Sequence, residues 1–242
     1  MIRYEGFTKR FGAVTAVSEL DLEVRRGETL ALIGPNGSGK TTTLKAALGL
    51  VRPTAGRVLV DGQDVSSRGR AVRARLGYLP QRLAFPEGCT PLEVMRLYAR
   101  LRGVGWEEAE RLLERVGLLG AADRAIEGFS GGMRQRLGLA VALLGEPAAL
   151  ILDEPTAALD LTGALMVREV IEKIRAEGMT VLLSSHDLGE VAALADRVAV
   201  FAGGRLVAVG RPADLARELG LRDPSLESIY RAATAPHARL VA

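Results

Sequence analysis

Residues 34–41 read Gly-Pro-Asn-Gly-Ser-Gly-Lys-Thr, and this run constrains the chain more than any other stretch. It follows the apolar residues 29–33 and precedes residues 42–48, whose composition favours a helix. A strand, a glycine-rich turn and a helix in this order are the context that the phosphate-loop motif G-x-x-x-x-G-K-[ST] requires. The run therefore predicts a nucleotide site on an α/β fold.

Each residue type in this run has a chemical use. Glycines let the backbone turn its N–H groups inward as a nest for phosphate oxygens, and the N-terminus of the following helix favours an anion. Lys40 supplies a mobile cation for the β- and γ-phosphates, and the Thr41 hydroxyl is a ligand for Mg²⁺. An ordinary glycine-rich loop would need neither. The residues expected to bind the nucleotide are Gly34, Pro35, Asn36, Gly37, Ser38, Gly39, Lys40, Thr41 and Thr42.

The size and composition of the chain suit one large α/β domain. With 242 residues, 48% of them hydrophobic, it can bury a sizeable core without disulfides. The single cysteine, Cys89, cannot form an internal disulfide, which suits a reducing compartment. Residues 1–5 lack the apolar core of a signal peptide, and no stretch approaches the ~20 apolar residues of a membrane span. We expect a soluble protein whose role at a membrane, if any, comes through a partner.

The formal net charge is +3, and almost all of the basic residues are arginines. Residues 67–75 form the densest basic run. No aromatic residues are interleaved there for stacking on bases, so no nucleic-acid partner is predicted. We interpret the run as a solvated face leading into the next strand.

The pattern of apolar residues predicts strands first and helices later. Residues 2–7, 17–24, 27–34 and 56–60 are expected to be strands, and residues 76–81 a short strand ending at Gln81. Helical spacing then appears in residues 91–101 and 106–116, which predicts a helical lobe inserted at about 82–130.

The second half alternates between helices and strands. The expected helices are residues 132–144 and 162–177, the expected buried strands 149–154 and 180–186, and the expected hairpin 197–209. In the tail, residues 211–242 approximately, two short helices are expected to begin at Pro212 and Pro224. His237, also in the tail, is expected to be solvated. Alternating strands and helices predict a mostly parallel sheet with an antiparallel β element at the N-terminus. We treat residues 1–242 as one domain.

Two further sites carry residue types that suit phosphate chemistry. Asp153 and Glu154 end an apolar strand, where open α/β sheets present ligand-binding groups, and Asp153 can hold Mg²⁺ beside Thr41. Ser130, Gly131 and Gly132 open a helix, which is either a second anion site or a plain N-cap.

Taken together, these motifs resemble the ATP-binding cassette (ABC) family of transporter ATPases, a branch of the P-loop NTPases. The phosphate loop, Gln81, the Ser-Gly-Gly turn at 130–132, Asp153-Glu154, Asp160 and His186 occur in the order of that family. The resemblance covers residues 4–210, and the Ser-Gly-Gly turn is specific to that family among phosphate-loop proteins.

The resemblance implies roles for individual residues. Phe11 matches the aromatic that stacks on adenine, usually a Tyr, and Gln81 matches the glutamine that senses Mg²⁺ and the attacking water. Glu154 matches the base that polarises this water, and His186 matches the switch histidine at the γ-phosphate.

The remaining matches concern a dimer. Ser130, Gly131 and Gly132 match the signature that binds the γ-phosphate held by the other subunit, although Phe129 stands before them where Leu is usual. Asp160 matches the residue that couples the two sites across the dimer.

The resemblance also implies cofactors, partners and a location. These are ATP with Mg²⁺, a homodimer or a heterodimer with a second cassette, and an integral membrane permease that keeps the subunit at the cytoplasmic face of the membrane. The compact segment at 78–81 and the ending at 224–230 look like export-type cassettes of drug efflux or copper-enzyme maturation. The alternative is a soluble ABC-type ATPase of iron–sulfur assembly, which is also single-cassette. No residue of this chain is expected to contact the transported cargo, because the cargo contacts would lie on the permease.

Overall fold

The computed structural model describes residues 1–235, so His237 lies outside the described part of the chain. The chain divides into two compact units. Residues 1–73 and 180–242 form the first unit, and residues 74–179 form the second. The helical lobe predicted at 82–130 falls inside the second unit, which also contains two strands and two longer helices.

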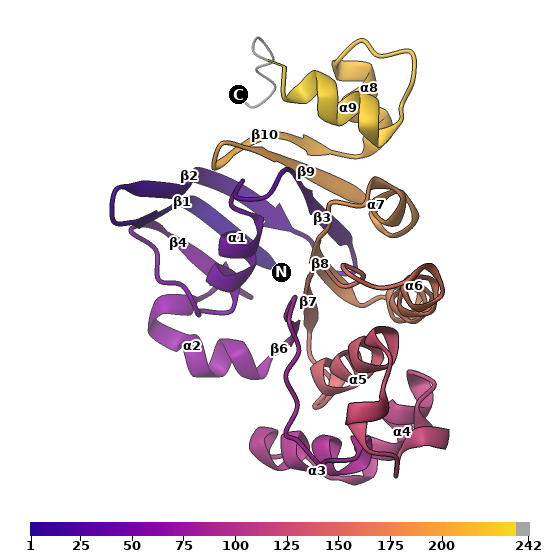
Figure 1. Cartoon of the computed structure of the whole chain (residues 1–242). Helices are drawn as coiled ribbons and strands as arrows, with labels where there is room; N and C mark the ends of the chain where they lie inside the picture. Colours follow the sequence, from indigo (N-terminus) through magenta and orange to yellow (C-terminus); the bar gives the residue numbers. More distant parts are fainter. Residues whose placement is uncertain (236–242) are drawn as a thin grey trace. The chain divides into compact units, whose positions relative to one another are not determined.

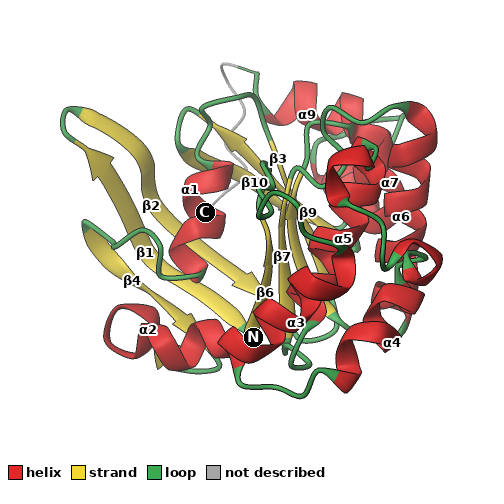
Figure 2. Ribbon diagram, turned by 60° about the horizontal axis from the view of Figure 1, so that its bottom comes forward, coloured by secondary structure: helices red, strands yellow, loops and turns green. Residues whose placement is uncertain are grey.

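The first unit contains an antiparallel sheet (Figures 1 and 2). Its strands, in the spatial order β2-β1-β4-β5, are β2 (Val14–Val24), β1 (Ile2–Phe11), β4 (Ala55–Val60) and β5 (Gln63–Asp64). Burial alternates in the second half of β2, as expected for a sheet with one covered face. The predicted antiparallel β element at the N-terminus is confirmed, and its strands β1 and β2 are longer than the sequence pattern indicated.

The same unit contains a second set of strands, which carries the phosphate loop. β3 (Thr29–Ile33) pairs in parallel with β8 (Thr180–Ser184) on one side and with β9 (Arg197–Ala202) on the other. β10 (Arg205–Gly210) returns antiparallel on β9. Every residue of β3 and β8 is buried, which explains why these strands are almost continuously apolar in sequence.

Within residues 1–235, five helices belong to the first unit. They are α1 (Lys40–Ala47), α2 (Val65–Ala74), α7 (Leu188–Leu194), α8 (Pro212–Glu218) and α9 (Leu226–Ala233). Helix α1 contacts β2 and β4 of the antiparallel sheet as well as β8, so it ties the two sets of strands together. Helix α8 begins at Pro212 as predicted, and α9 begins at Leu226, two residues after the predicted start at Pro224.

The basic run at 67–75 was interpreted as a solvated face leading into the next strand, and most of its residues are indeed exposed just before the strand that begins at Leu76, although its helical structure was not predicted. Most of the run lies in helix α2, which has only two buried residues, Val65 and Val72. Two apolar positions seven residues apart give too weak a helical period to recognise in the sequence. Helix α7 was also not predicted, because it has only seven residues.

The second unit contains a parallel pair of strands with helices. β6 (Leu76–Leu79) pairs with β7 (Ala149–Asp153). The helices are α3 (Pro91–Arg102), α4 (Glu107–Arg115), α5 (Gly131–Leu143) and α6 (Leu161–Ala176), with 3₁₀ turns η1 (Leu119–Ala121) and η2 (Ile126–Gly128). Within residues 1–235, no helix is long and apolar enough to cross a membrane.

Helices α5 and α6 approach each other closely. A Cβ on Gly132 would lie 2.9 Å from the Cα of Gly163, which leaves no room for a side chain between the two helix backbones. Gly132 is therefore required by packing in this unit, in addition to any role in binding an anion.

Candidate functional site

The phosphate loop joins β3 to α1, and two of its glycines have conformations that other residues rarely adopt. Gly34 has φ +155°, and a Cβ there would lie 2.4 Å from the backbone oxygen of Phe201. Gly39 has φ +105°, and its Cβ would lie 2.6 Å from the oxygen of Ala16. The loop therefore keeps its shape only with glycine at these positions.

The polar side chains of the loop fit a phosphate group. The Ser38 side chain is buried, and its hydroxyl oxygen has no hydrogen-bond partner within residues 1–235. Buried hydroxyls normally have a partner, so this one is suited to a ligand oxygen. Lys40 begins α1, is only 5% exposed, and its Nζ donates to the backbone oxygens of Gly34 (2.7 Å) and Pro35 (3.2 Å). These two hydrogen bonds stabilise the loop and hold the Lys40 ammonium beside the turn that would receive the phosphates.

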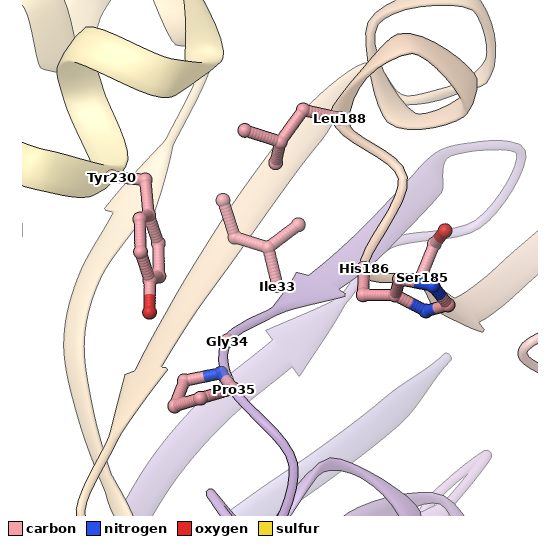
Figure 3. Close-up of a pocket in the computed structure, with 7 residues that line it drawn as sticks. All are labelled: Ile33, Gly34, Pro35, Ser185, His186, Leu188 and Tyr230. Atoms are coloured by element: carbon pink, nitrogen blue, oxygen red, sulfur yellow. The ribbon is translucent and has the colours of Figure 1, made fainter.

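A pocket of about 200 Å³ adjoins this loop in the first unit (Figure 3). Gly34 and Pro35 line it together with Ser185 and His186, which follow β8. Tyr230, from helix α9, is a further lining residue that the sequence analysis did not identify. Figure 3 shows Tyr230 and His186 on opposite sides of the pocket. The fold thus brings His186 to the phosphate loop, as the family resemblance requires.

A hydrogen-bonded corner holds the turn that carries His186. The hydroxyl of Ser185 donates to Oε2 of Glu190 (2.6 Å), and both residues are buried. The same hydroxyl accepts from the backbone N–H of Asp187 (3.1 Å). Asp187 in turn caps α7 by accepting from the N–H groups of Gly189 and Glu190. His186 is exposed, and both of its sequence neighbours, Ser185 and Asp187, are held by these hydrogen bonds. The backbone of His186 is therefore fixed on both sides.

Phe11 ends β1, and its side chain is available for stacking. It is 51% exposed, an unusual degree for a phenylalanine. The ammonium of Lys9 lies 4.8 Å from the ring centroid. An exposed ring of this kind can stack on a flat heterocycle.

Asp153 and Glu154 lie in the second unit, at the end of β7. Both are buried, at 1% and 6% exposure. Glu154 has φ +53°, a left-handed conformation that is rare for a residue with a side chain. Such conformations concentrate at functional sites. Burial, together with the negative charge of Asp153, raises the pKa of Tyr78 on β6 to about 12, so this phenol is neutral at ordinary pH.

The Ser-Gly-Gly turn begins helix α5. The Ser130 hydroxyl accepts from the N–H of Met133 (3.3 Å), so the plain N-cap role considered for this residue is real. Ser130 and Gly131 are nevertheless exposed, whereas Gly132 is buried against Gly163. Their contact with a partner's phosphate stays a prediction.

Asp160 caps the neighbouring helix α6, where Oδ1 accepts from the N–H of Gly163 (2.7 Å). The side chain is exposed just after the turn 155–158. Ala158 in this turn has φ +61°. The proposed coupling role of Asp160 across a dimer stays a prediction beside this structural one.

Gln81 follows β6 and is exposed. The next residues line a groove of about 210 Å³ in the second unit. Its lining combines apolar and charged residues, and consists of Leu83, Ala84, Phe85, Pro86, Glu87, Ile126, Glu127 and Arg134.

Mg²⁺ was predicted to be held by Thr41, Gln81 and Asp153. Thr41 lies in the first unit, and the other two lie in the second. Within residues 1–235 no group of three or more His, Cys, Asp or Glu side chains could hold a metal ion. A hydroxyl, an amide and one buried carboxylate still fit Mg²⁺, which usually takes few protein ligands and completes its shell with water and phosphate.

Comparison with known proteins identifies the family. The family model described as ABC transporter matches residues 17–157. The chain is 40% identical to the daunorubicin resistance ATP-binding protein DrrA3 of Streptomyces coeruleorubidus over 223 residues. These aligned residues cover 90% of this chain and 71% of the relative. It is 38% identical over 211 residues to the Nod factor export ATP-binding protein I of Cupriavidus pinatubonensis, with 86% and 65% covered. The chain belongs to the ABC transporter family.

Solved structures agree with this assignment. The ATP-binding subunit of an ABC transporter superposes with a TM-score of 0.87 at 31% identity, covering 97% of this chain and 99% of that one. The dimeric bacterial cassette MJ0796, known also in a post-hydrolysis state with ADP and Pi, superposes with a TM-score of 0.79 at 25% identity over 87% and 98%. The predicted family and fold class are confirmed, and the chain is an ATP-binding cassette with ATPase activity.

Proposed function

We propose that this chain is the ATP-hydrolysing subunit of an export-type ABC transporter, acting as a head-to-tail dimer on a separate permease at the cytoplasmic face of the membrane. The names of its relatives support export, since one is a drug-resistance protein and another a Nod factor export protein. The dimeric cassette MJ0796 supports the dimer. A homodimer and a heterodimer with a second cassette are both compatible with this proposal.

The first unit would bind ATP through the phosphate loop. The backbone N–H groups of the loop, the Ser38 hydroxyl and Lys40 would receive the phosphates, and Phe11 would stack on the adenine. His186 contacts the γ-phosphate from the turn that Ser185 and Glu190 hold. Most of this binding is electrostatic, because the transferred group carries concentrated negative charge.

Mg²⁺, when bound with ATP, neutralises charge on the β- and γ-phosphates. Thr41, Asp153 and Gln81 are the residues we propose to hold it. The burial of Asp153 supports this role, because a buried carboxylate is costly unless its charge is used.

Glu154 is the proposed general base. Its carboxylate accepts a proton from water as the water oxygen attacks the γ-phosphorus and the bond from that phosphorus to the β-phosphate oxygen breaks. ADP and phosphate leave. The left-handed backbone of Glu154 supports a functional role, because it directs this side chain differently from that of Asp153.

The exposed Ser130 and Gly131 would complete the site of the opposite subunit. We propose that ATP binding closes the dimer and moves the permease, and that hydrolysis reopens it. The groove after Gln81 would receive a permease helix, because its combination of apolar and charged lining residues suits an amphipathic segment.

The observation that carries the proposal is the buried, unpartnered Ser38 hydroxyl beside Lys40 in a loop that shares a pocket with His186. Glu154→Gln tests the mechanism. The amide keeps the shape of the side chain but cannot take the proton, so hydrolysis should fall by about 10²–10⁴-fold while ATP binding persists and a closed dimer accumulates.

A matched control exists for this variant. Glu146 is also a glutamate with a left-handed backbone (φ +48°), but it is exposed. Glu146→Gln should hydrolyse ATP at the parental rate. Parental hydrolysis by Glu154→Gln itself would move the base elsewhere, with His186 the next candidate. Both variants are compared by ATPase rate and by dimer fraction in MgATP.

Coupling to a permease is tested separately. Arg134→Glu in the lining of the groove should detach the subunit from membranes and leave basal ATPase intact, whereas Arg100→Glu on α3, outside the groove, should keep both membrane association and ATPase. Co-purification of the parent with a multi-helix membrane protein would separate transport from a role in iron–sulfur assembly. Unchanged membrane association of Arg134→Glu would refute the docking site.

A further inference from the structure

The basic run that the sequence analysis left without a function contributes to a pocket of about 230 Å³ in the first unit. The pocket lies among the end of α1, strand β4 and helix α2, away from the phosphate loop, and Figures 1 and 2 show α2 beside β4. Its apolar floor includes Ala46, Val58 and Val65, all of which are buried. Its charged lining consists of Arg52, Arg70 and Arg73, and no acidic residue lines it.

The three arginines have no counterion in the described part of the chain. None of them forms an ion pair within residues 1–235. Arg70 and Arg73 lie three residues apart on α2, so their side chains share one face of the helix and repel each other. The nearby carboxylate of Asp64 accepts from the N–H of Ser66 (2.7 Å) and does not line the pocket.

Two glycines let Arg73 reach across the pocket. Its Nη1 would lie 3.0 Å from a Cβ on Gly69 and 3.4 Å from a Cβ on Gly49. One glycine is on α2 and the other follows α1, so the guanidinium lies between the two helices. It is not needed to cap α1, because the N–H groups of Gly49 and Leu50 already donate to the oxygens of Ala46 and Lys45.

We propose that this pocket, defined by Arg52, Arg70 and Arg73, binds a phosphate group distinct from those of ATP. Guanidinium groups match phosphate oxygens with paired hydrogen bonds, and three of them compensate more than one negative charge. The volume is below the ~300–1,000 Å³ of pockets for drug-sized ligands, so the site suits a small phosphate compound or a lipid headgroup rather than a second nucleotide.

The test keeps the phosphate loop filled with saturating MgADP, so that added phosphate compounds report on the second site alone. Inorganic pyrophosphate is titrated while the melting temperature is followed, because a ligand of the folded state raises it. In parallel, the protein is sedimented with vesicles of phosphatidylglycerol or of phosphatidylcholine. Arg70→Gln and Arg73→Gln are compared with Arg68→Gln, a matched control that is exposed on the same helix and does not line the pocket.

We expect the parent to bind pyrophosphate or the anionic vesicles, which identifies a free or a lipid phosphate as the source. Each pocket variant should bind about 10- to 100-fold more weakly, since a hydrogen bond to a charged group is lost. Arg68→Gln should bind like the parent, and all variants should show the parental rise in melting temperature with MgADP, which verifies folding. Binding of neither probe by the parent, or an equal loss in Arg68→Gln, would overturn the proposal.

Discussion

The buried hydrogen bond between Ser185 and Glu190 should support both stability and catalysis. Ser185→Ala removes a 2.6 Å bond to a carboxylate whose residue is fully buried. Hydrogen bonds to charged groups contribute about 1.5–3 kcal/mol. In a chain of 242 residues, each kcal/mol shifts the melting temperature by about 2–4 °C. We therefore expect Ser185→Ala to melt about 3–12 °C below the parent.

The same substitution should affect turnover more than binding. His186 follows Ser185 directly, and loss of the bond releases one side of the turn that positions it. The contacts of Lys40 within the phosphate loop do not involve this turn. We expect kcat to fall while KM for ATP stays close to the parental value, measured below the melting temperature of both proteins.

Ser67→Ala is the matched control, because Ser67 is an exposed serine whose hydroxyl only donates to the oxygen of Asp64 (3.3 Å). Its unfolding free energy should stay within about 0.5 kcal/mol of the parent. If Ser185→Ala melted and turned over ATP like Ser67→Ala, the reasoning about this corner would be refuted.

Three further substitutions test other parts of the site. Lys40→Ala should abolish ATP binding and turnover, because the phosphate charge loses its cation; parental affinity in a nucleotide titration would contradict this role. Ala158→Gly should stabilise the protein by about 0.5–1 kcal/mol, since φ +61° strains any residue with a Cβ, and a lowered urea midpoint would show that the turn is not strained. Gly132→Ala should cost about 1–3 kcal/mol by pushing α5 from Gly163, and an unchanged midpoint would mean that the helices separate freely.

Sequence alone was enough for the family, the fold class and the ATPase activity, all of which are confirmed. The reason is that these follow from local patterns. Glycines at 34 and 39 permit the backbone of the phosphate loop, and continuous apolar runs correspond to β3, β7 and β8, which are buried throughout. Such preferences act over a few residues and can be read directly from the chain.

Tertiary structure decided which distant side chains meet. Tyr230 reaches the pocket beside Pro35 from the far end of the chain, and Arg52 lines the same pocket as the arginines of α2 because α1, β4 and α2 pack together around it. The sequence identified Gly132 only as part of a candidate anion site. The fold shows that the absence of a side chain at Gly132 also allows α5 to pack closely against α6. These roles depend on packing between elements far apart in sequence, and no local pattern of residue types encodes that packing.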